Sequence, residues 1–79
     1  MDHQAEYLLR SIVEEQTRTP WPALYLLAIH AHRYAREISG SLLSSELIAQ
    51  GFPSQQAERF GEEFDHYREL LTKYDRSQF

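Results

Sequence analysis

Residues 41–74, SLLSSELIAQGFPSQQAERFGEEFDHYRELLTKY, decide the fold of this chain. They read as a short helix over 42–50, a sharp Gly-Phe-Pro break, and a long amphipathic helix over 54–74. Gly51 can take the left-handed conformation that stops a helix, and Pro53 suits the first turn of the next one. The long helix carries one apolar stripe, which predicts a core-facing side. The stripe consists of Ala57, Phe60, Phe64, Tyr67, Leu71 and Tyr74.

Two earlier segments, at about residues 3–17 and 20–38, also carry helical patterns. Apolar side chains recur in each at the spacing that gathers them on one helix face. We expect Gly40 to end the second helix in a left-handed conformation, and Ser41 to cap the helix that follows. The tail 75–79 is expected to fray. The pattern as a whole predicts an all-α fold of about four helices, either a small orthogonal domain or a bundle.

The helix predicted over 20–38 holds more apolar surface than one core-facing stripe requires. Its inner stripe already comprises Leu24, Leu27, Ala28, Ala31, Ala35 and Ile38. The remaining large apolar and aromatic residues of its first half are Trp21, Tyr25, Leu26 and Ile29. These side chains must be buried against another element, which could be the first helix, the long helix or another chain. Because aromatic anchors often dominate interfaces, we expect self-association or partner binding through these four residues.

Composition is that of an ordinary globular domain, with 42% apolar and 25% charged residues. The 79 residues, 1–79, are enough for a single domain with a modest core. No Cys is present, so disulfides cannot reinforce that core. The remaining sources of extra stability for so small a domain are a metal, oligomerisation or a partner.

The balance of charge and the distribution of apolar residues exclude several classes of partner. Acidic residues number 12 against eight basic ones, and the net charge of -4 opposes binding to the phosphate backbone of nucleic acids. The most apolar stretch, residues 23–31, is far shorter than the roughly 20 residues of a membrane span. The N-terminus has no basic region followed by an apolar run, so it does not read as a secretory signal. We therefore expect a soluble, cytoplasmic protein without membrane insertion.

Catalytic and metal-binding patterns are sparse in this sequence. Glu63 and His66 have the Glu-x-x-His spacing of di-iron bundles, but such centres need two copies of it and two further Glu residues. His30 and His32 are two apart and point to different faces of a helix, and we expect one of them to be partly buried against a backbone carbonyl. No Gly-rich phosphate loop or nucleophile elbow occurs. The sequence therefore predicts a non-enzymatic protein without a metal or cofactor.

Residues 41–61 also have the order of short helix, turn and second helix that is typical of a DNA-binding helix-turn-helix. Gln55, Gln56 and Arg59 would begin the recognition helix, and Gln and Arg side chains can read base edges. Acidic residues on the same helix would repel phosphates. They are Glu58, Glu62, Glu63 and Asp65. A helical hairpin of the core explains the segment better, and we expect no binding to nucleic acid.

Two family resemblances involve the Gly51-Phe52-Pro53 turn. Residues 47–57, LIAQGFPSQQA, are similar to ubiquitin-associated domains, in which a Gly-Phe loop joins the first two of three short helices. The helix that follows here runs on without the second break of those domains. Residues 8–74 resemble the N-terminal helical domain of COMM-domain-containing proteins, with an Ala-rich apolar helix and a Ser/Gly break in the same order. The specific part is residues 43–64, where Leu-Ser-Ser-Glu-Leu precedes the turn and an acidic, aromatic helix.

The COMM resemblance implies a non-enzymatic adaptor that forms dimers and larger assemblies in endosomal cargo recycling and ubiquitin-linked regulation. The strand-rich COMM domain is absent from this sequence, which implies an isolated helical domain, a fragment or a divergent short relative. We expect a protein–protein interaction or adaptor module that binds a protein partner or forms a homo-oligomer. The alternative is a small acidic bacterial or phage regulator that binds and inhibits a transcription factor or an enzyme. A metal-dependent helical enzyme would have to rely on Glu63 and His66.

Overall fold

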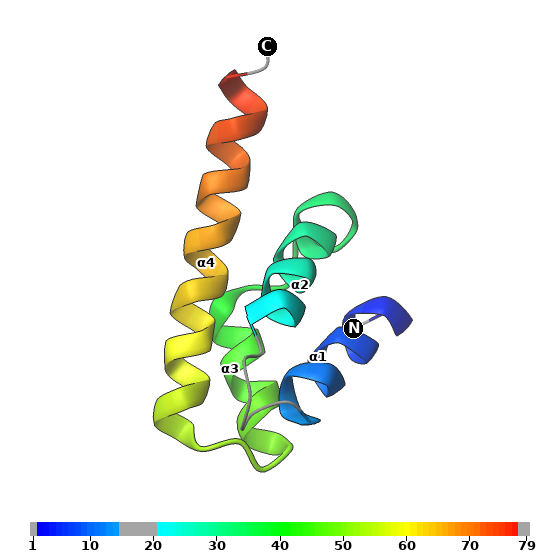
Figure 1. The fold of residues 1–79 in the computed structure, drawn as a ribbon, viewed down its shortest axis with the longest axis vertical. Helices are drawn as coiled ribbons and strands as arrows, with labels where there is room; N and C mark the ends of the chain where they lie inside the picture. The colour runs from blue at the N-terminus through cyan, green and yellow to red at the C-terminus, as the bar shows by residue number, and fades with distance from the viewer. Residues whose placement is uncertain (1, 15–20, 78–79) are drawn as a thin grey trace.

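The computed structural model describes residues 2–14 and 21–77, and this part of the chain forms four α-helices (Figure 1). They are α1 (His3–Glu14), α2 (Trp21–Tyr34), α3 (Gly40–Ala49) and α4 (Ser54–Ser77). None of the described residues lies in a β-strand. The predicted helical residues 15–17 and 20 lie outside the described residues. α4 packs against α3 and α2, and α1 packs against α2, so the predicted small, bundle-like all-α domain is confirmed.

The core lies where the apolar faces of the four helices meet. The predicted inner stripe of the second helix is buried throughout, as is the predicted face of α1 apart from the half-buried Val13. From α4, Phe64 is the largest fully buried side chain of the described residues. The stripe of α4 leaves the core after this residue, because Tyr67 and Leu71 are half-buried and Tyr74 is 59% exposed. A single helix face is therefore core at one end and surface at the other.

The turn between α3 and α4 forms as the sequence predicts. Gly51 has a φ of 92°, the left-handed conformation that residues with a side chain rarely adopt. Its N–H donates to the carbonyl oxygen of Ile48 (3.0 Å), and the N–H of Phe52 donates to that of Leu47 (2.9 Å). This pair of bonds is the Schellman motif, which closes the C-terminus of a helix. Phe52 is then buried against Phe60, with the ring centroids 5.2 Å apart.

α3 and α4 approach each other closely at two glycines, Gly40 and Gly61. A Cβ atom on Gly61 would lie 2.5 Å from the carbonyl oxygen of Gly40, so the crossing has no room for a side chain there. The main-chain N–H of Gly40 donates to Oδ1 of Asp65 (2.8 Å), and the hydroxyl of Ser44 donates to the carbonyl oxygen of Ala57 (2.8 Å). The Asp65 carboxylate lies at the N-terminus of α3, where the helix dipole favours negative charge. Together these contacts join α3 and α4 as an antiparallel pair.

The predictions for Gly40 and Ser41 were wrong. Gly40 is the first residue of α3 and has no positive φ. Ser39, rather than Ser41, caps that helix by accepting a hydrogen bond from the N–H of Leu42 (3.1 Å). The local sequence suits either arrangement, and the close contact of Gly40 with Gly61 in α4 decides between them.

α2 ends at Tyr34 rather than at residue 38 as predicted. In the segment that follows, carbonyl oxygens receive hydrogen bonds from a side chain of α4. Arg68 donates to the carbonyl oxygens of Arg36 (3.2 Å) and Ile38. Its guanidinium also lies over the ring of Phe64, 5.7 Å from the centroid. A cation from α4 therefore satisfies carbonyl groups in the segment after α2, a contact that local periodicity does not reveal.

α4 is longer than predicted and extends past the other helices. It continues to Ser77 where the sequence predicts fraying from residue 75, and Asp75 is paired with His32 of α2. Its 24 residues span about 36 Å at about 1.5 Å per residue, against about 21 Å for the 14 residues of α2. In Figure 1 the C-terminal end of α4 rises beyond α1, α2 and α3. This projecting end carries the exposed part of the apolar stripe.

Candidate functional site

A shallow apolar groove runs between α2 and the C-terminal half of α4. Its five lining residues are Tyr25, Tyr67, Leu70, Leu71 and Tyr74. Tyr25 comes from α2, and the other four lie on one face of α4 because they are three or four residues apart. The volume of the groove is about 360 Å³, at the lower end of the range for ligand pockets.

Two tyrosine rings form one wall of the groove. Tyr25 and Tyr67 pack edge to face, with ring centroids 5.4 Å apart and an angle of 80° between the ring planes. Such aromatic pairs contribute about 0.5–1.5 kcal/mol beyond the area that they bury. α4 therefore buries part of the Tyr25 side chain, yet 46% of Tyr25 remains exposed. The contact orients the ring without closing the groove.

Large apolar side chains remain exposed along the open side of the groove. Leu70 is 48% exposed and Tyr74 is 59% exposed. The stripe of α4 is buried as far as Phe64, and beyond that residue Tyr67 and Leu71 keep only partial cover. Contiguous apolar surface of this kind on a small domain commonly marks an interaction site.

One exposed pair of opposite charges lies on α4, outside the groove lining. Glu69 and Lys73 are one helical turn apart, with 3.8 Å between Oε1 and Nζ. Their side chains are 67% and 69% exposed, so water screens the pair and it adds little to stability. Lys73 follows Leu70 by three residues, which places these two side chains next to each other on the helix surface. The apolar centre of the groove therefore has a charged rim.

His32 ties the end of α4 to α2. It is only 7% exposed, and its Nε2 contacts Oδ2 of Asp75. The carbonyl oxygen of His32 accepts a hydrogen bond from Nε of Arg36 (3.1 Å). The expected bond to a backbone carbonyl is wrong, because Nε2 of His30 and Nε2 of His32 each contact a carboxylate. The expected partial burial is confirmed for His30. As expected, the two rings point to different partners.

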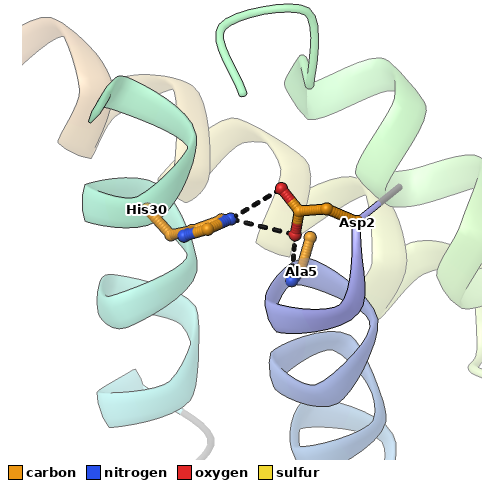
Figure 2. A network of polar contacts seen from close by, with 3 residues as sticks. All are labelled: Asp2, Ala5 and His30. Carbon is orange, nitrogen blue, oxygen red and sulfur yellow. Dashed lines mark hydrogen bonds and ion pairs between the residues drawn. The ribbon is translucent and has the colours of Figure 1, made fainter. Parts of the chain in front are cut away.

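His30 joins α2 to the start of α1, as Figure 2 shows. Its Nε2 lies 2.9 Å and 3.0 Å from the two carboxylate oxygens of Asp2. Asp2 also caps α1, because its Oδ1 accepts a hydrogen bond from the N–H of Ala5 (2.8 Å). The Ala5 N–H and, next, the His30 ring hold the pKa of Asp2 below its ordinary value of 3.8. This pair positions α1 and lies apart from the groove.

The four residues predicted to form an interface have different positions. Tyr25 lines the groove. Leu26 is 52% exposed and Ile29 is half-buried, and both lie outside the groove lining. The side chain of Trp21 lies outside the described residues. Sequence reasoning missed Leu70, because this residue lies beside the predicted stripe of α4 rather than in it.

The remaining candidates for chemistry do not converge. Glu63 is half-buried and His66 is exposed on α4. Within residues 2–14 and 21–77, no three His, Asp or Glu side chains form a group that could hold a metal ion. Over the same residues, no helix has both the length and the apolar character needed to cross a bilayer.

The groove offers apolar surface and phenol hydroxyls framed by a charged rim, an arrangement that suits the binding of an amphipathic segment. No protein-family model, curated protein or solved structure matches this chain.

Proposed function

We propose that this chain is a non-enzymatic protein–protein interaction module that binds an apolar segment of a partner in the groove between α2 and α4. The observation that carries the proposal is the set of half-exposed large side chains at Tyr25, Leu70 and Tyr74. Tyrosine is enriched among the residues that dominate protein interfaces. Its ring buries a large area while only two side-chain torsions lose their freedom.

The shape of the groove favours a helix as the bound segment. Four of its five lining residues lie along the axis of α4, so the apolar strip is long and narrow. A helix laid beside α4 would present apolar side chains at steps of three and four residues, matching the spacing of Tyr67, Leu70 and Tyr74. The charged rim at Glu69 and Lys73 would then contact the polar flank of that helix.

The biological role that we propose is that of an adaptor. The resemblance of residues 43–64 to the N-terminal domain of COMM-domain-containing proteins supports a role within a larger assembly of the trafficking type. A bacterial or phage regulator that inhibits a transcription factor or an enzyme would also need an apolar binding surface. The identity of the protein that the groove binds distinguishes these two roles.

The experiment compares three versions of the full chain: wild type, Leu70→Lys and Leu42→Lys. Leu42 is the matched control, because it is also an exposed leucine on a helix (37% exposed) but lies on α3, outside the groove lining. Each version is immobilised and incubated with a lysate of the source cells, and the captured proteins are identified by mass spectrometry. Captured proteins are then purified and their affinities for the three versions measured by calorimetry.

We expect a specific partner to bind wild type and Leu42→Lys alike and to lose most of its affinity for Leu70→Lys. The physical reason is that a lysine ammonium at the centre of an apolar interface loses its hydration when the partner binds. Circular dichroism should show that all three versions keep their helical content. A partner that binds Leu70→Lys as tightly as wild type would contradict the proposal.

A further inference from the structure

We propose that one occupant of the groove is a second copy of this chain, docked antiparallel so that the C-terminal halves of two α4 helices lie side by side. This inference rests on the proposed function, because it uses the same groove. Two features of the described residues carry it. One is the spacing of the apolar side chains, and the other is the order of the charges beside them.

The apolar strip of α4 is self-complementary in an antiparallel pair. Tyr67, Leu70 and Tyr74 are separated by three and four residues, the spacing at which side chains of two packed helices interdigitate. In an isologous pair, Tyr67 of one copy meets Tyr74 of the other, and Leu70 meets Leu71. The half-buried Tyr67 and the exposed Tyr74 of each copy therefore flank an aliphatic centre, and both halves of the interface are the same.

The exposed pair of opposite charges on α4 also matches in this orientation. Glu69 and Lys73 lie one turn apart, so an antiparallel second copy brings each Glu69 beside the Lys73 of the other chain. A parallel pair would instead bring like charges together. Complementary charges of this kind fix the orientation of a helix pair more than they strengthen it.

The distribution of charge along the chain allows the C-terminal end of α4 to contact the same end of a second copy. The chain carries a net charge of -4, which opposes self-association over most of its surface. Residues 67–77 hold three basic and two acidic residues, a net charge of +1, which leaves -5 on the rest of the chain. Two copies that meet at this end therefore keep their strongly acidic parts apart.

The exposed area sets the strength of the dimer. A Tyr side chain buries about 150–250 Å², so half-exposed side chains of this size offer roughly 100 Å² each. The three most exposed groove residues and their neighbours would bury well under the roughly 1,200 Å² in total of a stable interface. We therefore expect a weak, reversible dimer that forms at high micromolar concentrations.

A charge-swap experiment tests this pairing on the full chain. Sedimentation equilibrium at low salt is measured for wild type, Lys73→Glu, Glu69→Lys and an equimolar mixture of the two variants. Wild type should dimerise with increasing concentration, and each single variant should dimerise roughly tenfold more weakly, because both of its ion pairs become like-charge contacts. In the mixture, a chain with two glutamates at these positions meets a chain with two lysines. The two variants should therefore associate with each other as strongly as wild type does with itself.

Three results would overturn the inference: a wild type that stays monomeric at millimolar concentration, single variants that dimerise as wild type does, or a mixture that does not restore association. Circular dichroism of each variant excludes unfolding as the cause. Different results would refute the proposed function and the second copy. If wild type stays monomeric but a foreign partner is lost with Leu70→Lys, only the second copy is refuted. If wild type dimerises as predicted but a foreign partner binds Leu70→Lys as tightly as wild type, only the binding of that partner in the groove is refuted.

Discussion

Gly61→Ala tests whether the close crossing of α3 and α4 is essential to this fold. In an exposed helix interior, replacing Gly by Ala stabilises a protein by about 0.5–1 kcal/mol. Here the new Cβ would lie 2.5 Å from the carbonyl oxygen of Gly40 and 3.2 Å from its carbonyl carbon, and it would collide with Oγ of Ser44. Backbone atoms cannot rotate away as a side chain can, so α3 would have to move.

The structural cost exceeds the gain in helix propensity. Inserting a methyl group into a closely packed contact costs about 1–3 kcal/mol. Displacing the Ser44 hydroxyl also breaks its hydrogen bond to the carbonyl oxygen of Ala57, which costs about 1 kcal/mol more. We therefore expect Gly61→Ala to lower the free energy of unfolding by about 1–3 kcal/mol. In a domain of this size each kcal/mol shifts Tm by about 4–8 °C, so Tm should fall by roughly 4–24 °C.

The assay is thermal and urea unfolding followed by circular dichroism. Glu62→Ala is the matched control, because Glu62 is the next residue on α4 and is exposed. This control should change stability by no more than about 0.5 kcal/mol. If Gly61→Ala melts at or above the temperature of wild type, the crossing is looser than described and the reasoning is refuted.

Three further substitutions test the turn, the core and the start of α1. Gly51→Ala should lower the free energy of unfolding by about 1–2 kcal/mol, because a φ of 92° strains any residue with a Cβ; urea unfolding with no loss would contradict this. Phe64→Ala should cost about 3–5 kcal/mol in the same assay, since its ring is fully buried; a loss typical of surface substitutions would show that the core lies elsewhere. Asp2→Asn keeps the cap but removes the charge. Because the folded chain lowers the pKa of Asp2, the carboxylate stabilises the fold above pH 3.8 and loses this effect as pH falls through the lowered pKa. The melting temperatures of wild type and Asp2→Asn should therefore differ at neutral pH and converge in acid, and a difference that persists in acid would contradict the assignment.

Features that depend on local sequence could be predicted in this chain. Gly51 and Phe52 close α3 by hydrogen bonds to residues within five positions, so the break is encoded where it occurs. The buried faces of α1 and of the first half of α4 follow from apolar periodicity, because each is covered as the pattern requires.

Features that depend on contacts between distant segments could not be predicted. Gly40 comes directly after a segment with a helical pattern, a position where glycine often ends a helix. Only its contact with Gly61 shows that it begins α3 instead. Arg68 likewise binds carbonyl oxygens of the segment after α2 from 30 or more residues away. The groove was missed for a similar reason. Periodicity predicted that Tyr67 and Leu71 face other helices, but it does not show how far along α4 the neighbouring helices bury that face.

The central claim is that other polypeptides bind this chain in the groove between α2 and α4, and amide chemical-shift mapping tests it most directly. Isotope-labelled wild type is titrated with unlabelled wild type and, separately, with a purified protein that it captures. We predict that the shifted signals cluster at Tyr25 and residues 66–75 in at least one titration, while signals from α1 and the outer face of α3 stay constant. Shifts that cluster on α1 or α3 in both titrations, with the groove signals unchanged, would contradict the account.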